Sequence, residues 1–391
     1  MNALEQRLFA DGPKRILSLD GGGIRGAITL GYLLEIETRL RKRYNQPDLV
    51  LRDYFDLIGG TSTGSIIAAS LAIGMSVADI RDGYLDMGGH IFESPAAWWQ
   101  VRKLFRQNLL YRNKPSRIEG TLQEFYGDTT LADERITTGL VIVTKRADRA
   151  STWPFHNNPR GRYYETNGPI PLHRLVRASS AAPTYFPPRI LDYGNGKGAF
   201  IDGGVSMHNN PSALLFLMAT VKGYRFEWPA GDDRLMLVSI GTGTSEKRQD
   251  LEGIFGLGKK NALFWGKAVP DLFIRDTGEF SETIMQLLSQ SPTARRLDRQ
   301  IGDLQEDNVL GRQLHYVRYN ALIDDAVVER HRSYTRENPA HFPPIPDVKK
   351  MMAMDKGNHV YHLARVGELD AKEKITDANF DVHFPGRFDV G

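Results

Sequence analysis

Two consecutive units near the start of the chain, each a strand, a glycine-rich turn and a helix, most constrain the fold. The apolar run Arg15 to Leu19 predicts a buried strand, and residues 27–44 then carry apolar side chains at helical spacing. The second unit has a predicted strand at Tyr54 to Ile58, a turn at Gly59 to Gly64 and a helix at Ser65 to Ile73. Such alternation is typical of an α/β fold with a parallel sheet.

Later segments extend this pattern and then change it. Further strands are predicted at Leu140 to Thr144, Ala199 to Ile201 and Leu235 to Ile240. From about Ser245 the chain is more charged and less strand-like, with helices predicted at Phe280 to Leu288 and Pro346 to Met354. We therefore expect a three-layer α/β sandwich with a central, mostly parallel sheet.

The expected division of the chain follows from this change near Ser245 to a more charged and less strand-like sequence. Residues 14–245 are predicted to form the α/β core, and residues 246–391 a mostly helical portion packed on that core. A separate C-terminal domain is the alternative. The 391 residues, 41% of them hydrophobic, are enough for one large core or two ordinary ones.

Charge and composition exclude several classes of function. Fifty basic residues are nearly balanced by forty-seven acidic ones, so the net charge of +3 indicates no nucleic-acid partner. The absence of cysteine excludes disulfides, a thiol nucleophile and thiolate metal sites. The first residues lack a basic stretch followed by an apolar one, and no apolar run is long enough to span a bilayer. We expect a cytoplasmic protein whose membrane contacts are peripheral.

The first glycine-rich turn, Asp20-Gly21-Gly22-Gly23-Ile24-Arg25-Gly26, fits two kinds of site. A G-x-G-x-x-G sequence after a strand is the fingerprint of dinucleotide-binding proteins, whose backbone amides hold a pyrophosphate. Amides at a helix N-terminus also stabilise the oxyanion that forms when a carbonyl is attacked. The second unit presents a serine, and Glu37 lies in mid-helix rather than at the strand end where a ribose-binding acid belongs, so the oxyanion hole is favoured.

Ser62 stands in the second turn within Gly60-Thr61-Ser62-Thr63-Gly64, the pattern of a nucleophile elbow. A sharp turn from strand to helix holds such a serine in a strained conformation, and side chains two positions away on either side would collide. Gly60 and Gly64 meet this requirement. A closely packed turn whose serine only caps the helix is the alternative.

A serine nucleophile needs a base, and histidine is the usual one. Here, however, the motifs DGGGIRG, GTSTG and DGG, in this order, resemble those of the patatin-like phospholipases. The segments Ala178 to Pro188 and Asn209 to Pro211 are similar to two further signatures of that family. The resemblance implies a patatin-like fold and a catalytic dyad of Ser62 and Asp202 that lacks a histidine.

The candidate site is then assembled from the three motifs. The resemblance makes Ser62 the nucleophile and Asp202 the base. The surrounding residues are those of the oxyanion loop (Gly21, Gly22, Gly23, Ile24, Arg25 and Gly26), the nucleophile elbow (Gly60, Thr61, Thr63 and Gly64) and the acid turn (Gly203 and Gly204).

The base has competing interpretations. Asp202 suits the role provided that burial raises its pKa from about 3.9 toward the working range. Asp-Gly-Gly is also common turn chemistry, so a purely structural aspartate is the alternative. His208 would complete the order Ser, Asp, His of α/β-hydrolases, but it follows the acid too closely, and we expect a polar neighbour of the site. His359 and His362 lack companion acids, so no metal is predicted.

Two segments combine aromatic and basic residues in a way that suits an anionic membrane surface. In the first, from Trp98 to Lys114, no acidic residue interrupts the run. The second extends from Ile254 to Lys267. An amphipathic helix packed on the core is the alternative for both. The predicted membrane contacts are Trp98, Trp99, Arg102, Lys103, Phe105 and Arg106.

The resemblance implies a lipid acyl hydrolase of the phospholipase A type. It would cleave carboxyl esters of glycerophospholipids through an acyl-serine intermediate, without metal or cofactor. Some bacterial relatives are similar in being activated by cyclic nucleotides, so a signal-activated, membrane-degrading effector with a small-molecule activator is one alternative. A nucleotide-binding protein that uses the loop from Gly21 to Gly26 is the other.

Overall fold

One mixed sheet organises the part of the chain that the computed structural model describes, namely residues 1–91, 115–183, 185–194, 196–245, 262–307, 309–337, 348–352 and 359–380. Its strands are β1 (Lys14–Leu19), β2 (Leu57–Thr61), β3 (Gly139–Arg146), β4 (Thr152–His156), β5 (Arg189–Asp192), β6 (Lys197–Asp202), β7 (Leu235–Ile240), β8 (Ser289–Gln290) and β9 (Leu314–Tyr319). The strand order is β5-β6-β3-β2-β1-β7-β9-β8, and β4 pairs with β3 outside this path. The pairs formed by β1, β2, β7, β8 and β9 are parallel, as is β2 with β3, whereas β4, β5 and β6 pair antiparallel.

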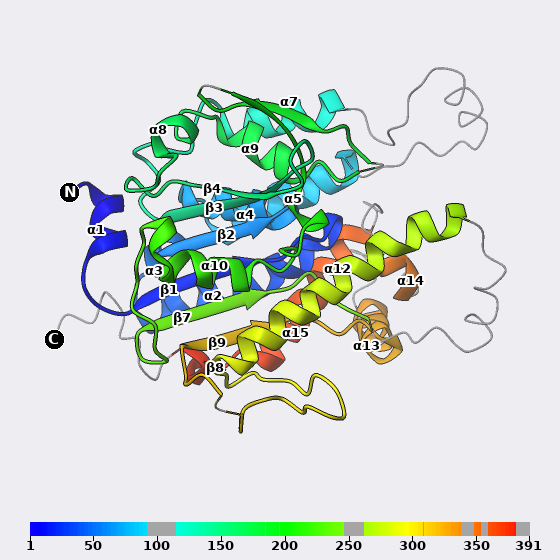
Figure 1. Cartoon of the computed structure of the whole chain (residues 1–391). Helices are drawn as coiled ribbons and strands as arrows, with labels where there is room; N and C mark the ends of the chain where they lie inside the picture. Colours follow the sequence, from blue (N-terminus) through cyan, green and yellow to red (C-terminus); the bar gives the residue numbers. More distant parts are fainter. Residues whose placement is uncertain are drawn as a thin grey trace, which may run out of the picture.

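Helices cover both faces of the sheet (Figure 1). They are α1 (Ala3–Phe9), α2 (Gly26–Arg43), α3 (Leu51–Tyr54), α4 (Thr63–Ala72), α5 (Val77–Ile91), α7 (Pro115–Tyr126), α8 (Tyr164–Asn167), α9 (Leu172–Ser179), α10 (Ser212–Thr220), α12 (Ala262–Leu287), α13 (Asp325–Glu337), α14 (Val348–Met351) and α15 (Val360–Lys374). Short 3-10 turns lie at η1 (Gly23–Arg25), η2 (Gly203–Val205), η3 (Lys222–Tyr224) and η6 (Asp377–Phe380). This is the expected α/β sandwich with a mostly parallel sheet.

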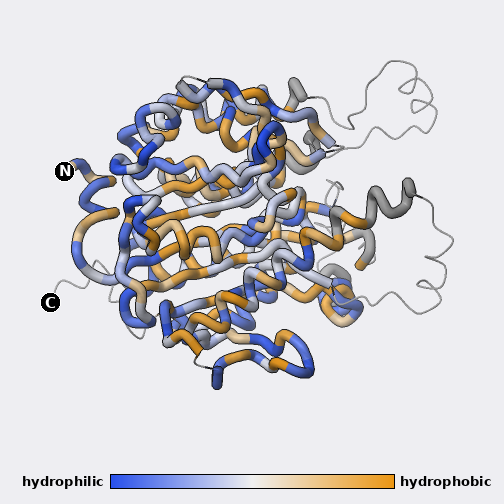
Figure 2. Tube along the Cα trace, in the orientation of Figure 1, coloured by the Kyte–Doolittle hydropathy of each residue, from blue (hydrophilic) through white to orange (hydrophobic). Residues whose placement is uncertain are grey.

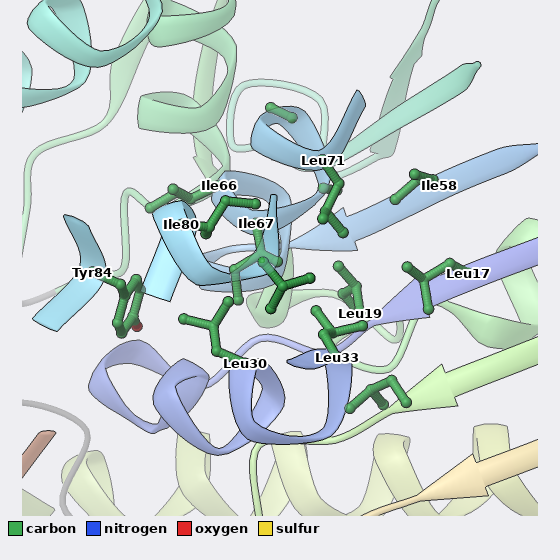
Figure 3. Packing of buried hydrophobic residues seen from close by; sticks show 14 of the residues in the cluster. Leu17, Leu19, Leu30, Leu33, Ile58, Ile66, Ile67, Leu71, Ile80 and Tyr84 are labelled. Carbon is green, nitrogen blue, oxygen red and sulfur yellow. The ribbon is translucent and has the colours of Figure 1, made fainter. Parts of the chain in front are cut away.

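Alternation along the strands divides the core into two layers. In β1, Leu17 and Leu19 pack with α2 and α4 on one face, where they meet residues such as Leu30 and Ile67 (Figure 3). Ile16 points to the other face and packs with residues of α1 and α10. Because both faces are covered, β1, β2 and β7 are buried along their whole length, as parallel strands usually are, and apolar residues recur in this central region (Figure 2).

The C-terminal portion contributes to the same sheet. The strand β9, which the sequence did not predict, pairs with β7 and extends the parallel region. Two of its residues are polar: the ring of His315 meets the Asn379 carbonyl, and Arg318 meets Asp20. These partners lie far away in the sequence, so the pattern of β9 alone did not indicate a buried strand.

Helix α15 packs closely along α2. A side chain at Gly31 of α2 would collide with the backbone of Gly367, and one at Gly367 would lie 2.3 Å from the Ile28 carbonyl oxygen. Two glycines thus allow the two helix backbones to approach. The hydroxyl of Tyr32 also donates a hydrogen bond to Asp370. The proposed division of the chain near residue 245 stays a prediction.

Several predicted boundaries need correction. The strand expected at Tyr54 to Ile58 begins later, because Asp53 accepts a hydrogen bond from the Val50 amide and residues 51–54 form the helical turn α3. The expected turn at Gly59 to Gly64 was wrong in its first half: residues 59–61 belong to β2, which is held between β1 and β3.

The predicted helices agree more closely. Residues 27–44 correspond to α2, Ser65 to Ile73 to α4, and Phe280 to Leu288 to the last part of the longer α12. The helix expected at Pro346 to Met354 appears as α14, and its two outermost residues at each end lie outside the described ranges. No helix in those ranges combines the length and apolar character needed to cross a bilayer.

Candidate active site

Sheet register brings Ser62 and Asp202 together. Thr61, the last residue of β2, pairs with Val143 of β3, and the next residue of β3, Thr144, pairs with Asp202. On its other edge Thr144 pairs with Trp153 of β4, so β6 runs along the edge of β3 that β2 has just left. The end of β6 therefore meets the end of β2.

Ser62 has the geometry of a nucleophile at a sharp turn. Its φ of 54° and ψ of −122° are a strained combination for a residue that has a side chain. The side-chain oxygen Oγ donates a hydrogen bond to Oδ2 of Asp202 at 2.7 Å. This direct contact is what transfer of a proton from the hydroxyl to the carboxylate requires.

Asp202 is held in a buried position that changes its acidity. Its other oxygen, Oδ1, accepts a hydrogen bond from the Gly204 amide at 2.7 Å, which fixes the carboxylate in the acid turn. Burial raises the pKa of Asp202 to about 6, although the hydrogen bonds from Ser62 and Gly204 and the charge of Arg177 lower it. The carboxylate is therefore ionised near neutral pH and yet more basic than an exposed aspartate.

The glycines of the elbow are required by close backbone contacts. A side-chain carbon on Gly60 would lie 2.1 Å from the carbonyl oxygen of Gly64. One on Gly64 would lie 2.3 Å from the carbonyl oxygen of Leu19, at the end of β1. Neither backbone atom can move without displacing a strand or α4, so the predicted need for small residues on both sides of Ser62 has a direct steric cause.

The glycine loop lies against Ser62. A carbon built on Gly21 would lie 3.2 Å from Cβ of Ser62. The Gly21 amide donates to the carbonyl of Asn209, and the Arg25 amide donates to the carbonyl of Gly22, so neither is available to an oxyanion. Within the described ranges no protein acceptor takes the amides of Gly22 and Gly23. Of the six predicted loop residues, Gly21 and Arg25 therefore have amides that are already bonded, and the oxyanion role of the others stays a prediction.

Neighbouring side chains hold this loop in place. Asn209 donates from its amide to the Gly21 carbonyl at 3.3 Å, and its Oδ1 lies where side chains on Gly21 or Gly204 would be. Thr242, just after β7, donates to the same carbonyl at 3.1 Å and leaves no room for a side chain on Gly22. Asn209 therefore fills the space between the glycine loop and the acid turn.

Ile24 and Arg25 have structural contacts. Ile24 is fully buried in the core layer that contains α2. The guanidinium of Arg25 donates to the Gly243 carbonyl at 3.1 Å and lies near the sulfur of Met352, so this arginine joins the loop to later parts of the chain. At the following position, the Gly26 amide bonds within η1.

The histidines weighed in the sequence take no part in the hydrogen bond between Ser62 and Asp202. Within the described ranges the ring of His208 has no hydrogen-bond partner, while its backbone carbonyl accepts from Thr61 at 2.6 Å. Burial and the charge of Lys145 lower the pKa of His208. His362 meets His331 at 3.0 Å. No group of three or more histidine, aspartate or glutamate side chains in the described part of the chain is arranged to hold a metal.

The predicted membrane contacts cannot be placed. Trp98, Trp99, Arg102, Lys103, Phe105 and Arg106 all lie outside the described residues. The same holds for residues 254–261 of the second segment, whereas its last residues begin α12.

Three residues that the sequence did not single out also shape the site. Ser179 accepts a hydrogen bond from the Ser62 amide, Tyr84 links the elbow to the glycine loop, and Arg318 pairs with Asp20 at the start of that loop. Only Ser179 lies in a segment that carried a family signal. Tyr84 and Arg318 reach the site through tertiary contacts that no local pattern indicates.

Comparison with known proteins adds family information. A family model described as "Patatin-like phospholipase" matches residues 17–216, which include Ser62 and Asp202. A "cGAMP-activated phospholipase" of Escherichia coli (strain TW11681) is 32% identical over 229 residues, covering 58% of this chain and 62% of that protein. A protein of the same name from Vibrio cholerae is 34% identical over 209 residues, covering 51% and 56%.

Plant proteins match as well. "Patatin-03" of Solanum tuberosum is 28% identical over 270 residues, covering 64% of this chain and 66% of that protein. Each of these three alignments spans less than two thirds of the relative. Among solved structures, VipD from Legionella pneumophila has a TM-score of 0.36 at 14% identity, over 91% of this chain and 67% of that one, a likeness too weak to support an argument. The family model covers just over half of the chain, and the chain belongs to the patatin-like phospholipase family.

Proposed function

We propose that the protein is a lipid acyl hydrolase of the phospholipase A type, which cleaves carboxyl esters of glycerophospholipids with a dyad of Ser62 and Asp202. The observation that carries this proposal is the 2.7 Å hydrogen bond from Ser62 Oγ to a buried carboxylate. The membership of the chain in a phospholipase family supplies the class of substrate.

In the first half of the reaction, Ser62 Oγ attacks the ester carbonyl carbon while its proton passes to Oδ2 of Asp202. The negative charge that develops on the carbonyl oxygen is stabilised by the amides of Gly22 and Gly23, which no acceptor in the described part of the chain occupies. When the tetrahedral intermediate collapses, the bond to the alcohol oxygen breaks. Asp202 returns the proton to that oxygen, and the acyl group stays on Ser62.

The second half of the reaction repeats these steps with water. Asp202 takes a proton from the water molecule as its oxygen attacks the acyl-serine carbonyl. Collapse of this intermediate releases the fatty acid, and the proton returns to Ser62 Oγ. One carboxylate thus acts alternately as base and acid, a role that a pKa of about 6 suits better than the ordinary value for aspartate.

The substrates of this reaction lie in a bilayer, so we propose that the protein binds peripherally at a membrane surface. The aromatic and basic segment from Trp98 to Lys114 stays the predicted contact. Flotation with anionic liposomes at low and high salt tests it. Neutralising Arg102, Lys103 and Arg106 together should reduce recovery at low salt, and equal recovery would contradict the prediction.

Release of fatty acid tests the catalytic proposal directly. Mixed phospholipid liposomes are incubated with the wild type, Ser62→Ala and His208→Ala, without added metal, and the products are identified by mass spectrometry. We expect release by the wild type and by His208→Ala, and none by Ser62→Ala. A folded His208→Ala variant as inactive as Ser62→Ala would replace the dyad with a triad, and labelling of Ser62→Ala by a fluorophosphonate would refute the nucleophile.

The names of two relatives favour a second element of the proposal, activation by a small molecule. Both are cGAMP-activated phospholipases, at 32% and 34% identity. We therefore propose that a cyclic dinucleotide controls this enzyme. The liposome assay with and without cGAMP tests this point, since an unchanged rate would exclude that activator while leaving the hydrolase proposal intact.

The packing of the glycine loop argues against nucleotide binding there. Ser62 lies against Gly21, and Thr242 occupies the space beside Gly22. Thermal-shift measurements with NAD, NADP and ATP test this alternative, because a nucleotide held by the loop would raise the melting temperature.

A further inference from the structure

The backbone amide of Ser62 lies at a point where regular secondary structure offers it no partner. The strand β2 ends at Thr61 and α4 begins at Thr63, so Ser62 belongs to neither element. A buried amide without an acceptor costs free energy, and the positive φ of Ser62 adds backbone strain. Something outside these two elements must stabilise the turn.

Ser179, the last residue of α9, provides that contact. Its Oγ accepts a hydrogen bond from the Ser62 amide at 2.9 Å and donates one to the Val143 carbonyl at 2.6 Å. The side chain is fully buried. Because the only hydroxyl proton is used on β3, the oxygen faces Ser62 as an acceptor, and the orientation of the bond is determined.

The same short segment also holds the base. The Asp202 amide donates to the carbonyl of Ala181 at 3.1 Å, two residues after Ser179. Val143, whose carbonyl accepts the hydrogen bond from Ser179, pairs with Thr61. The same carbonyl oxygen lies against Gly203, because a side-chain carbon on that glycine would be only 2.4 Å from it. Residues 179–181 therefore contact the backbone of both members of the dyad.

We infer that Ser179 is a positioning residue, which fixes the backbone of Ser62 so that Oγ stays within hydrogen-bond distance of Asp202. This inference rests on the proposed function. It assigns a role to the segment from Ala178 to Pro188, which the dyad chemistry itself does not use. It also explains why the Ser62 amide does not serve the oxyanion, because that amide is already bonded to Ser179.

The variant Ser179→Ala tests the inference, with Ser180→Ala as the matched control. Ser180 is the next residue and caps the end of α9, and its hydroxyl donates to the Val176 carbonyl in the last turn of that helix at 2.8 Å. We expect Ser179→Ala to lower kcat by roughly 10- to 100-fold with little change in KM, because a small displacement of a nucleophile has effects of this size. Ser180→Ala should stay within about twofold of the wild type.

A pH profile separates positioning from general destabilisation. The hydrogen bond from Ser62 lowers the pKa of Asp202, so a displaced Ser62 hydroxyl should move the acidic limb of kcat/KM to higher pH. A merely destabilised protein would keep the limb of the wild type. Full activity of Ser179→Ala with an unshifted limb would overturn the inference.

Hydrogen exchange gives a readout that needs no activity. Peptides that span residues 57–66 report the Ser62 amide, whose exchange should become roughly tenfold faster in Ser179→Ala and stay unchanged in Ser180→Ala. Ser179→Thr, which keeps the hydroxyl, should retain the protection. Equal exchange in Ser179→Ala and the wild type would refute the contact even if the wild type hydrolysed no lipid, whereas an inactive wild type with the expected exchange would refute only the proposed function.

Discussion

Arg318 and Asp20 form a buried, two-pronged ion pair at the start of the glycine loop. Nη1 and Nη2 of the arginine donate to the two carboxylate oxygens at 2.9 and 2.7 Å, and the side chains are only 7% and 8% exposed. Arg318 lies on β9, outside residues 17–216 that the family model matches. A later part of the chain thus holds the residue that precedes Gly21.

Removal of this arginine should destabilise the protein strongly. Arg318→Leu leaves the Asp20 carboxylate buried without its counter-charge, so we expect the free energy of unfolding to fall by about 3–5 kcal/mol. Turnover should fall as well, because Asp20 leads into the loop that carries the proposed oxyanion donors. Denaturant unfolding and the liposome assay measure the two effects.

Arg330 offers a matched control for that variant. It pairs with Glu373 at 2.8 Å, but both side chains are more than half exposed. Arg330→Leu should therefore cost less than about 1 kcal/mol and leave turnover unchanged. Similar small losses in both variants would contradict a supporting role for the buried pair.

The rate of hydrolysis should depend on the ionisation of Asp202. In the proposed mechanism the carboxylate form of Asp202 is the base, and its pKa is about 6, so kcat/KM should rise with pH and reach half of its plateau near pH 6. Fatty acid release at low substrate concentration, measured from pH 4 to 8, gives this profile. A half-maximal value near pH 4 would contradict a desolvated base.

The same pKa makes a prediction about stability. Between pH 3.8, the ordinary pKa of aspartate, and about pH 6, the Asp202 carboxyl is protonated to a greater extent in the folded protein than in the unfolded chain. Stability from this group therefore falls as pH rises through that window and is lost above it. Asp202→Asn removes the buried charge, so at pH 8 we expect its free energy of unfolding to exceed that of the wild type by about 1–3 kcal/mol.

This gain in stability should accompany a loss of activity. The amide in Asp202→Asn cannot accept the Ser62 proton, so turnover of the variant should be close to that of Ser62→Ala. At pH 4, where the wild-type carboxyl is protonated, the difference in stability should largely disappear. A variant that is less stable than the wild type at both pH values would contradict the proposed desolvation of the base.

Tyr84 connects the nucleophile elbow with the glycine loop. Its hydroxyl donates to the Gly23 carbonyl at 2.6 Å and bonds Oγ1 of Thr63 at 2.7 Å. Tyr84→Phe should lower the free energy of unfolding by about 1–2 kcal/mol and kcat by roughly tenfold, because the two parts of the site lose their link.

Tyr126→Phe provides the comparison. The hydroxyl of Tyr126 is also buried and also meets α4, where it donates to the Ile66 carbonyl at 2.8 Å and contacts Ser70 at 3.0 Å. We expect a similar loss of stability with kcat within about twofold of the wild type. Equal effects of the two variants on kcat would show that Tyr84 acts only through stability.

What could be predicted from the sequence was local in character. The elbow around Ser62 follows from glycines within two residues, and the central strands follow from short apolar runs. The start of β2 was placed too early, because the helical turn α3 depends on a capping contact of Asp53 rather than on apolar periodicity.

The supporting contacts depend on distant parts of the chain. Arg318 is one of the polar residues of β9, and these residues hide the pattern of a buried strand. Only the folded structure shows that Asp20 neutralises the buried charge of Arg318. Tyr84 lies on the amphipathic helix α5, and the sequence of that helix does not distinguish Tyr84 from an ordinary core residue. The pairing of both residues with the site is a property of the sheet order and helix packing, which local patterns do not encode.

Strand β6 continues along the edge of β3 where β2 ends. This arrangement affects which parts of the sequence can change in length. Ser62 and Asp202 are separated by 140 positions in the sequence but by a single step of the β3 ladder. Their spacing is therefore set by strand register, and the connecting chain can gain or lose surface segments without altering it. Natural variation and engineered insertions in that connection can therefore change which molecules reach the site while the distance between Ser62 and Asp202 stays the same.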